Sequence, residues 1–214
     1  MTTVEDRPVH FADSTGSTED LVLDPQAQRL LFTSARTANT FDDEPVTDEQ
    51  VRAIYDLVKW APTAMNTQPL RVVLVRSPQA RERLVSLMAE GNKAKTASAP
   101  LVAILAADGD FHEHLDELLP YLQDPAARFA DPAGREKVAR FNATLQAGYF
   151  LLGVRAAGLA AGPMGGFDAD GVDREFFAGT ALRSLLVVNI GRPGPDAWMD
   201  RLPRLRHDNV VTSL

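Results

Sequence analysis

The pattern of apolar and polar positions predicts several helices. Residues 47–50, TDEQ, have the composition of a capping box, in which Thr and Gln satisfy free amide groups at the start of a helix. The apolar positions that follow keep the i, i+3, i+4, i+7 spacing of one helix face: Val51, Ile54, Tyr55 and Val58. We expect this helix to run into Pro62. Shorter helices are predicted over residues 24–34, with Asp24 as the N-cap, and over residues 78–90.

Three short apolar runs favour buried strands. They are residues 70–75, 100–107 and 182–190, and each is rich in aliphatic or β-branched side chains. Residues 137–161 predict one long helix that is apolar over most of its circumference, so it needs cover on more than one face. Strands separated by helices, without internal repeats, indicate an α/β or α+β sandwich whose strand order is not readable from the sequence.

The other segments indicate one domain with a leader and an excursion. Residues 1–22 are polar and acidic, which is typical of a disordered leader and not of a signal peptide. Residues 108–136 are rich in Asp, Glu and Pro and weakly periodic, so we expect them to leave the core, as a lid does. Residues 23–214 then form a single domain.

Composition narrows the class of protein. A chain of 214 residues that is 45% hydrophobic can bury one full core. The absence of cysteine excludes disulfides and thiolate metal sites, and it suits a cytoplasmic protein. A formal net charge of -7 argues against a nucleic-acid surface, and no apolar stretch is long enough to indicate a membrane span.

Residues 60–69, WAPTAMNTQP, carry a dense set of polar groups between two prolines. The hydroxyl and amide groups of Thr63, Asn66 and Gln68 cannot all satisfy one another within a tight loop. These residues by themselves favour an ordinary connection between a helix and a strand.

Together with four other segments, residues 60–69 resemble the nitroreductase family of flavoproteins. The four segments agree with family motifs in order and spacing, and they are residues 35–39 (ARTAN), 92–95 (NKAK), 162–167 (GPMGGF) and 201–203 (RLP). The resemblance implies an α+β fold, a three-layer sandwich with a central mixed β-sheet flanked by helices, in an intertwined homodimer. It also implies an FMN-dependent oxidoreductase that takes hydride from NADPH or NADH in a ping-pong cycle through flavin N5.

The resemblance further implies which residues bind FMN. Arg36 and Arg201 would bind the phosphate, since a guanidinium donates two parallel hydrogen bonds. Lys95 would face N1 and O2 of the ring, where a cation favours the reduced flavin. Neutral hydrogen bonds and backbone contacts would come from Thr37, Asn39, Asn66, Asn92, Pro163, Met164, Gly165 and Gly166. The wall that one subunit offers to its partner's flavin would consist of Pro62, Thr63, Ala64 and Asn66. The flavin would carry the hydride, so no catalytic side chain is assigned.

Several segments are similar in sequence to segments of the malonic semialdehyde reductases of this family, namely KWAPT, QAGYFLLGVRAAGL, EFFAG and RLPRL. This likeness implies reduction of malonic semialdehyde to 3-hydroxypropionate, with Arg128 and Arg140 as candidates for the substrate carboxylate. A nitroaromatic or quinone reductase, and a flavin-binding protein without turnover, are the alternatives.

The sequence also departs from the family pattern. Ala35 and Asn39 stand where many members have basic residues, Met199 where some have Lys, and Gly165 where some have Glu. The set of cations toward FMN is therefore thinner than in those members.

Residues 108–117, DGDFHEHLDE, raise a separate hypothesis. Imidazole and carboxylate groups suit Zn or Mn, so His112, His114 and the neighbouring acids could hold a metal. The spacing matches no fixed signature, which favours a solvated acidic segment instead. Neither GxSxG, GxGxxG nor a P-loop occurs in the chain.

Overall fold

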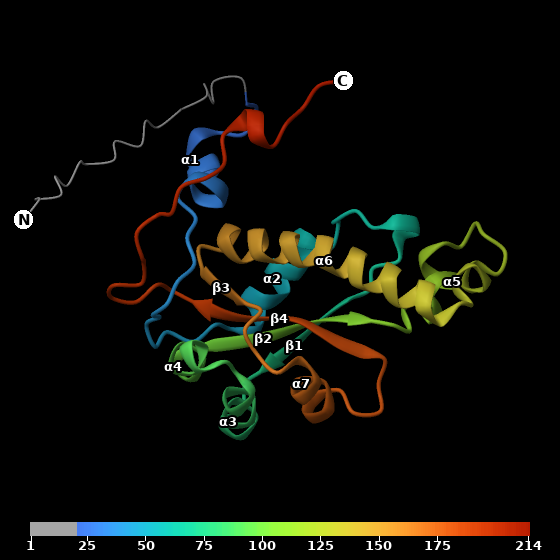
Figure 1. Ribbon diagram of the computed structural model, residues 1–214, viewed down its shortest axis with the longest axis horizontal. Helices are drawn as coiled ribbons and strands as arrows, with labels where there is room; N and C mark the ends of the chain where they lie inside the picture. The colour runs from blue at the N-terminus through green and yellow to red at the C-terminus, as the bar shows by residue number, and fades with distance from the viewer. Residues whose placement is uncertain (1–20) are drawn as a thin grey trace, which may run out of the picture.

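A four-stranded sheet lies at the centre of the protein, whose computed structural model describes residues 21–214 (Figure 1). In spatial order the strands are β1 (Leu70–Val75), β2 (Leu101–Asp108), β4 (Leu182–Gly191) and β3 (Ala160–Met164). Each of the three pairings is antiparallel. All eight residues of β2 are buried, because this strand has neighbours on both edges and helices on both faces.

The three strands predicted from apolar runs are confirmed, but the fourth was not predicted. Residues 160–164, AAGPM, were expected to end the long helix and begin a turn. They form β3 instead, at the edge of the sheet, where the missing N–H of Pro163 is tolerated. The expected mixed sheet is wrong for the described residues, since every pairing among them is antiparallel.

Helices cover both faces of the sheet and complete three layers, as expected for the α+β sandwich (Figure 1). One face carries α2 (Asp48–Val58) and α6 (Pro132–Ala156), and the other carries α3 (Pro78–Leu87) and α7 (Ala169–Phe176). The remaining helices are α1 (Pro25–Gln28), α4 (Glu90–Ser98) and α5 (Leu115–Leu118), with a π-helical turn at Arg29–Thr33 and 3-10 turns at Ala64–Asn66, Phe111–His114, Pro125–Phe129 and His207–Asn209. None of the helices in residues 21–214 has the length and apolar character that crossing a bilayer requires.

The helix ends follow from local capping. The predicted capping box of α2 is present, because the Thr47 hydroxyl accepts from the Gln50 amide and the Gln50 side chain accepts from the Thr47 amide. Helix α6 begins five residues earlier than predicted, since the Asp131 side chain caps it. It ends at Ala156 because Gly158 adopts a left-handed φ of 75°, so the predicted continuation to residue 161 is wrong.

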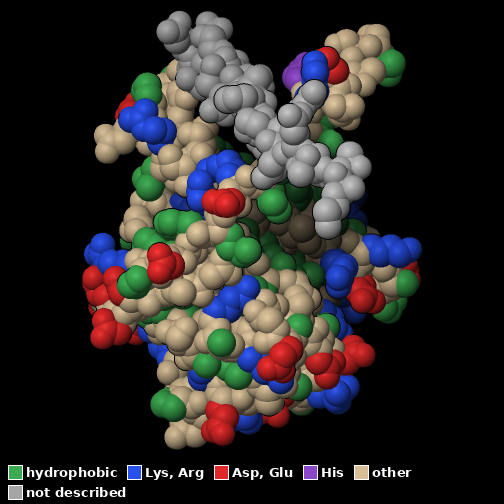
Figure 2. All heavy atoms as spheres, turned by 60° about the vertical axis from the view of Figure 1, so that its left-hand side comes forward, with side chains coloured by type: hydrophobic (Ala, Val, Ile, Leu, Met, Phe, Trp, Pro, Cys, Tyr) green, Lys and Arg blue, Asp and Glu red, His purple; other side chains and the backbone are tan. Residues whose placement is uncertain are grey.

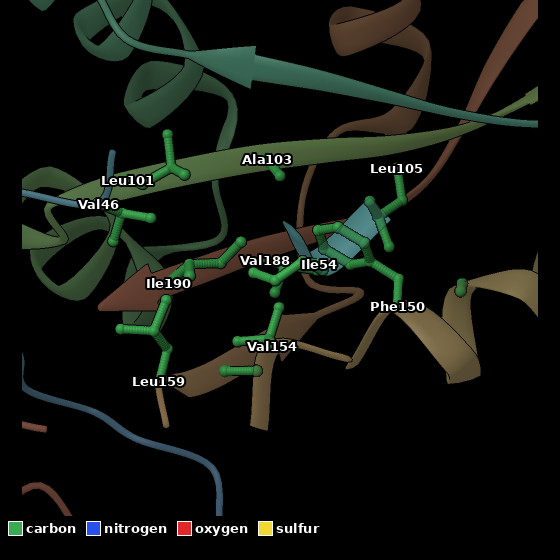
Figure 3. Packing of buried hydrophobic residues seen from close by; sticks show 12 residues of the cluster. Val46, Ile54, Leu101, Ala103, Leu105, Phe150, Val154, Leu159, Val188 and Ile190 are labelled. Carbon is green, nitrogen blue, oxygen red and sulfur yellow. The ribbon is translucent and has the colours of Figure 1, made fainter. Parts of the chain in front are cut away.

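The larger core cluster joins α2 and α6 to the sheet (Figure 3). Ile54 from α2 and Phe150 from α6 meet Leu105 and Val188 of the central strands. The two helices pack closely at Gly153, where an added Cβ would collide with Val58. On the opposite face a second cluster gathers side chains of α3 and α7 around β2 and β4, including Leu84, Val102, Ile104, Val172 and Val187.

The predicted excursion leaves the sheet but holds a small core of its own. Phe111, Leu115 and Phe129 are buried against Ala139 and Ala143 of α6. The prediction that this segment lies outside the core is therefore wrong in part, because its apolar side chains dock on the N-terminal half of the long helix. Of the predicted leader, residues 1–20 lie outside the described residues.

Candidate functional site

A pocket of about 280 Å³ brings together four residues predicted to bind the cofactor, Arg36, Thr37, Asn39 and Arg201. The chain before the domain core and the chain after it form this pocket jointly. Arg36 donates to the carbonyl oxygen of Met199 at 3.1 Å, and Arg201 donates to that of Thr33 at 2.7 Å. The rest of the lining consists of Ala35, Met199, Asp200, Leu202 and Arg204.

The pocket is locally positive in a chain of net charge -7. Arg36, Arg201 and Arg204 line it, against one carboxylate, Asp200. Within residues 21–214, none of these three cations forms an ion pair. Because each guanidinium carries five N–H groups, donors remain for an anionic group. Arg204 also lines the pocket, although it was not among the residues predicted from the sequence.

Helix α4 and the turn after β3 supply a second group of predicted residues. The side chain of Asn92 donates to the carbonyl oxygen of Gly166 at 2.9 Å. Lys95 is half-buried, and its Nζ lies 3.5 Å from Oδ1 of Asn39, which connects this group to the pocket. A Cβ at Gly165 would meet no atom within 4 Å, whereas one at Gly166 would meet Nδ2 of Asn92 at 2.7 Å. The backbone at Gly165 is thus open to a flat ligand.

Pro163 and Met164, both predicted to contact FMN, are the last two residues of β3. Met164 is buried, and its sulfur lies 3.8 Å from the Thr96 hydroxyl and 3.9 Å from the side-chain nitrogen of Asn189. Its side chain therefore belongs to the core.

Arg81 positions α4 although it lies outside the predicted set. Its guanidinium donates to the carbonyl oxygens of Thr96 and Ala99, at 3.0 and 2.6 Å, and to that of Val75 at 3.2 Å. Burial lowers the pKa of Arg81 from its usual value. These bonds fix the C-terminal end of the helix that carries Lys95.

Residues 62–69 contain the four predicted wall residues, and this whole segment is called the wall below. It lies between α2 and β1 and has a strained backbone. Met65, Asn66 and Gln68 have left-handed φ angles of 51°, 50° and 42°. For residues other than glycine, such angles cost on the order of 1 kcal/mol each. Pro62, Ala64 and Asn66 are exposed, and Nδ2 of Asn66 donates to the carbonyl oxygen of Leu118 in α5 at 3.1 Å.

The wall segment and the pocket lie at opposite ends of the sheet. The amide of Asp108 donates to the carbonyl oxygen of Pro69, so the wall adjoins the end of β2 that leads into α5. The pocket lies at the other end of the sheet. There the backbone N–H of Asn39 donates to the carbonyl oxygen of Ala197, and Ala38 packs on Ala160, the first residue of β3. Eight residues of β2 span about 24 Å. Figure 1 shows α5 and α4 correspondingly at the two ends. One chain therefore does not bring its own wall and pocket together.

The side chains of the acidic segment around His112 are not gathered around a common point in the described part of the chain. Nε2 of His112 lies 3.3 Å from the Arg135 guanidinium, which also approaches Asp110 at 3.8 Å. Nowhere in residues 21–214 do three or more His, Cys, Asp or Glu side chains gather as metal ligands would.

Figure 2 turns the end of the molecule that carries α4 toward the viewer and shows acidic and basic side chains interspersed over that face.

Comparison with known proteins shows the family of this chain. The sequence profile described as "Nitroreductase family" matches residues 33–192. A protein of Streptomyces coelicolor, named provisionally as an NADH dehydrogenase/NAD(P)H nitroreductase, is 65% identical over 197 residues, which cover 91% of this chain and 99% of that protein. A protein of Leptothrix cholodnii with the same provisional name is 52% identical over 193 residues, which cover 90% of this chain and 98% of that protein.

Solved structures show the same fold. A nitroreductase-like protein of Exiguobacterium sibiricum, crystallised in complex with FMN, has a TM-score of 0.77 at 18% identity, covering 87% of this chain and 96% of its own. A Bacillus subtilis protein of the same kind has a TM-score of 0.76 at 24% identity, covering 84% of this chain and 95% of its own. The profile match and the close relatives together establish that this chain belongs to the nitroreductase family.

Proposed function

We propose that this protein is an FMN-dependent NAD(P)H oxidoreductase with its cofactor at the interface of a homodimer. The observation that supports it best is the pocket where Arg36 and Arg201 meet, linked through Asn39 to Lys95. The names of the close relatives and the FMN complex of the Exiguobacterium protein also support it.

The residues present fit FMN in their chemistry. The guanidinium groups of Arg36, Arg201 and Arg204 suit a phosphate dianion, with Thr37 and Asn39 as neutral partners. The open backbone at Gly165 suits the edge of a flat ring. When bound, FMN supplies hydride transfer through ring nitrogen N5, which serves a ping-pong exchange between NAD(P)H and an acceptor.

The chain's own residues bind and orient the reactants and exclude water from them. Lys95 places a positive charge where negative charge gathers on a reduced ring, which favours reduction. Asn92 fixes the turn at Gly166 through its 2.9 Å bond, so the backbone there keeps one position. The wall shields the cofactor of the other subunit from solvent and holds the second reactant near it, through Pro62, Thr63, Ala64 and Asn66.

A homodimer brings the wall of one subunit to the pocket of the other. The separation of about 24 Å between the ends of β2 requires a second copy for this. Apolar side chains are exposed along α2, the following turn and α6, which a partner would cover, namely Tyr55, Leu57, Trp60, Phe141, Leu145 and Tyr149.

For the acceptor we propose malonic semialdehyde, which hydride and proton transfer would convert to 3-hydroxypropionate. The sequence blocks similar to malonic semialdehyde reductases support this choice. Arg128, in the turn Pro125–Phe129, and Arg140, on α6, are both exposed and remain the candidates for the substrate carboxylate. Nitroaromatics and quinones are the competing acceptors.

The test begins with the absorbance spectrum of the purified protein. Bound flavin that bleaches when NADH or NADPH is added without oxygen supports the proposal, and bound flavin that does not bleach identifies a binding protein without turnover. Steady-state oxidation of the reduced nicotinamide then compares malonic semialdehyde with a nitroaromatic and a quinone. If the aldehyde is no faster than the other two acceptors, the proposed substrate is wrong, while the FMN oxidoreductase assignment stands.

A further inference from the structure

Two side chains on the inner face of α6, Asn142 and Gln146, hold the wall segment, residues 62–69. We propose that they are positioning residues, which fix the wall against the flavin of the partner subunit and thereby set its reactivity toward the acceptor. The inference rests on the proposed function for the flavin. The two hydrogen bonds by which Asn142 and Gln146 fix the wall, called the hold below, are present in the chain without flavin. Neither residue belongs to the set predicted to bind FMN.

The hold consists of two hydrogen bonds to backbone amides. Oδ1 of Asn142 accepts from the N–H of Ala64 at 2.7 Å, and Oε1 of Gln146 accepts from the N–H of Leu70 at 3.0 Å. The two side chains are four residues apart, so they project from the same face of α6. The first bond lies near the start of the wall, and the second fixes the first residue after it.

Burial indicates that these amide side chains serve a purpose besides packing. Asn142 is 1% exposed and Gln146 is 9% exposed, in a helix whose neighbouring buried positions hold alanine. A buried amide is unfavourable unless its polar atoms have partners. Both polar atoms of the Asn142 amide have a partner, because its Nδ2 donates to the Val138 carbonyl oxygen at 2.9 Å while its oxygen accepts from the N–H of Ala64.

The backbone of the wall explains why such a hold is needed. The left-handed φ angles of Met65, Asn66 and Gln68 persist only where the surrounding contacts determine them. Inside the wall, the Gln68 side chain donates to Oδ1 of Asn66 at 2.9 Å, and the backbone N–H of Gln68 donates to the Thr63 hydroxyl oxygen at 3.2 Å. These bonds order the wall internally, whereas Asn142 and Gln146 fix its place relative to the helix.

The first experiment measures the hold directly. In Asn142→Leu, amide hydrogen exchange at Ala64 should accelerate at least about tenfold, because the N–H loses its buried acceptor. In Gln146→Leu the same should occur at Leu70. Exchange at Ile104, in the central strand, serves as the reference for global stability. Thr144→Ala is the matched control, since Thr144 is exposed on the same helix and its hydroxyl donates to the Arg140 carbonyl oxygen, away from the wall.

The second experiment separates positioning from structure by kinetics. Asn142→Leu should lower kcat with the acceptor about tenfold or more, because a small misplacement of a reacting surface has a large effect on rate. The dissociation constant for FMN should change less than about threefold, since the phosphate pocket belongs to the other subunit. Asn142→Asp should recover activity as the pH falls, because the protonated carboxyl regains both a donor and an acceptor.

The outcomes distinguish this inference from the proposed function. Unchanged exchange at Ala64 in Asn142→Leu would overturn the hold, whatever the flavin content. Faster exchange with an unchanged kcat would overturn the positioning role. A wild-type protein that binds no flavin would instead contradict the proposed function, and the exchange data would still decide whether Asn142 and Gln146 fix the wall.

Discussion

The guanidinium of Arg36 donates to the carbonyl oxygen of Met199, 3.1 Å away and 163 positions later in the chain. A reciprocal bond runs from Arg201 to the Thr33 carbonyl oxygen at 2.7 Å. Each cation thus fastens the segment that carries the other. Both segments form the pocket, so we expect its affinity for an anion to depend on both arginines.

Replacement of Arg201 by Ala is expected to weaken FMN binding by about 10-fold to 100-fold, since a hydrogen bond to a charged group contributes about 1.5–3 kcal/mol. Fluorescence titration of flavin-free protein with FMN measures the change. Riboflavin is the matched ligand, because it lacks the phosphate. Its affinity should be the same in wild type and variant, and an equal loss for both ligands would contradict a phosphate role for Arg201.

Lys95→Met should lower the midpoint potential of the bound flavin by about 30–60 mV, which corresponds to about 1.4–2.8 kcal/mol for two electrons. The reason is the loss of a half-buried positive charge next to a ring that gains negative charge on reduction. Titration against a reference dye measures the potential. Lys93→Met is the control, since Lys93 pairs with Glu90 on the same helix. An equal shift in both variants would contradict the assignment of Lys95.

Gly165→Val should leave the free energy of unfolding within about 0.5 kcal/mol of wild type, because a Cβ at Gly165 meets no atom of residues 21–214 within 4 Å. FMN affinity should nevertheless fall, since the added side chain projects into the space proposed for the ring. Urea unfolding of flavin-free protein and FMN titration measure the two effects. Lower stability with normal FMN affinity would reverse this interpretation.

Gly153→Ala should destabilise the protein by about 1–3 kcal/mol, because the new methyl group collides with Val58 between α2 and α6. Gly148→Ala is the control on the same helix. A Cβ at Gly148 meets no atom within 4 Å, so alanine there should be neutral or stabilise by up to about 1 kcal/mol. Chemical denaturation measures both variants, and equal effects would show that the close helix packing is not limiting.

Local signals predicted much of the fold. The capping box at Thr47 and the β-branched runs of β1, β2 and β4 act through neighbouring residues, so they are visible in the sequence. Strand β3 is five residues long and contains Gly162 and Pro163, so only its pairing with β4 defines it. The early start of α6, by contrast, had a local signal that was overlooked, because Asp131 followed by Pro132 is the same pair as Asp24 and Pro25 at α1.

The sequence motifs predicted residues for the candidate site but not the arrangement of those residues. The motifs predicted Arg36, Lys95 and Arg201 as cofactor-binding residues, and the structure brings Arg36 and Arg201 into one pocket. The left-handed backbone at Met65 has no sequence signal, because methionine rarely adopts it. The hold by Asn142 and Gln146 was also invisible, since polar residues on a mainly apolar helix acquire a partner only in the tertiary structure.

The placement of the wall and the pocket at opposite ends of the sheet has a genetic consequence. In a homodimer, each site would draw one half from each subunit, so defects in the two halves belong to different complementation groups within a single gene. A subunit with a damaged pocket, Arg201→Ala, paired with a subunit with a damaged hold, Asn142→Leu, would make one dimer with one intact site and one doubly defective site. Equal mixing with random pairing would restore about a quarter of the wild-type sites, although each variant alone has none intact.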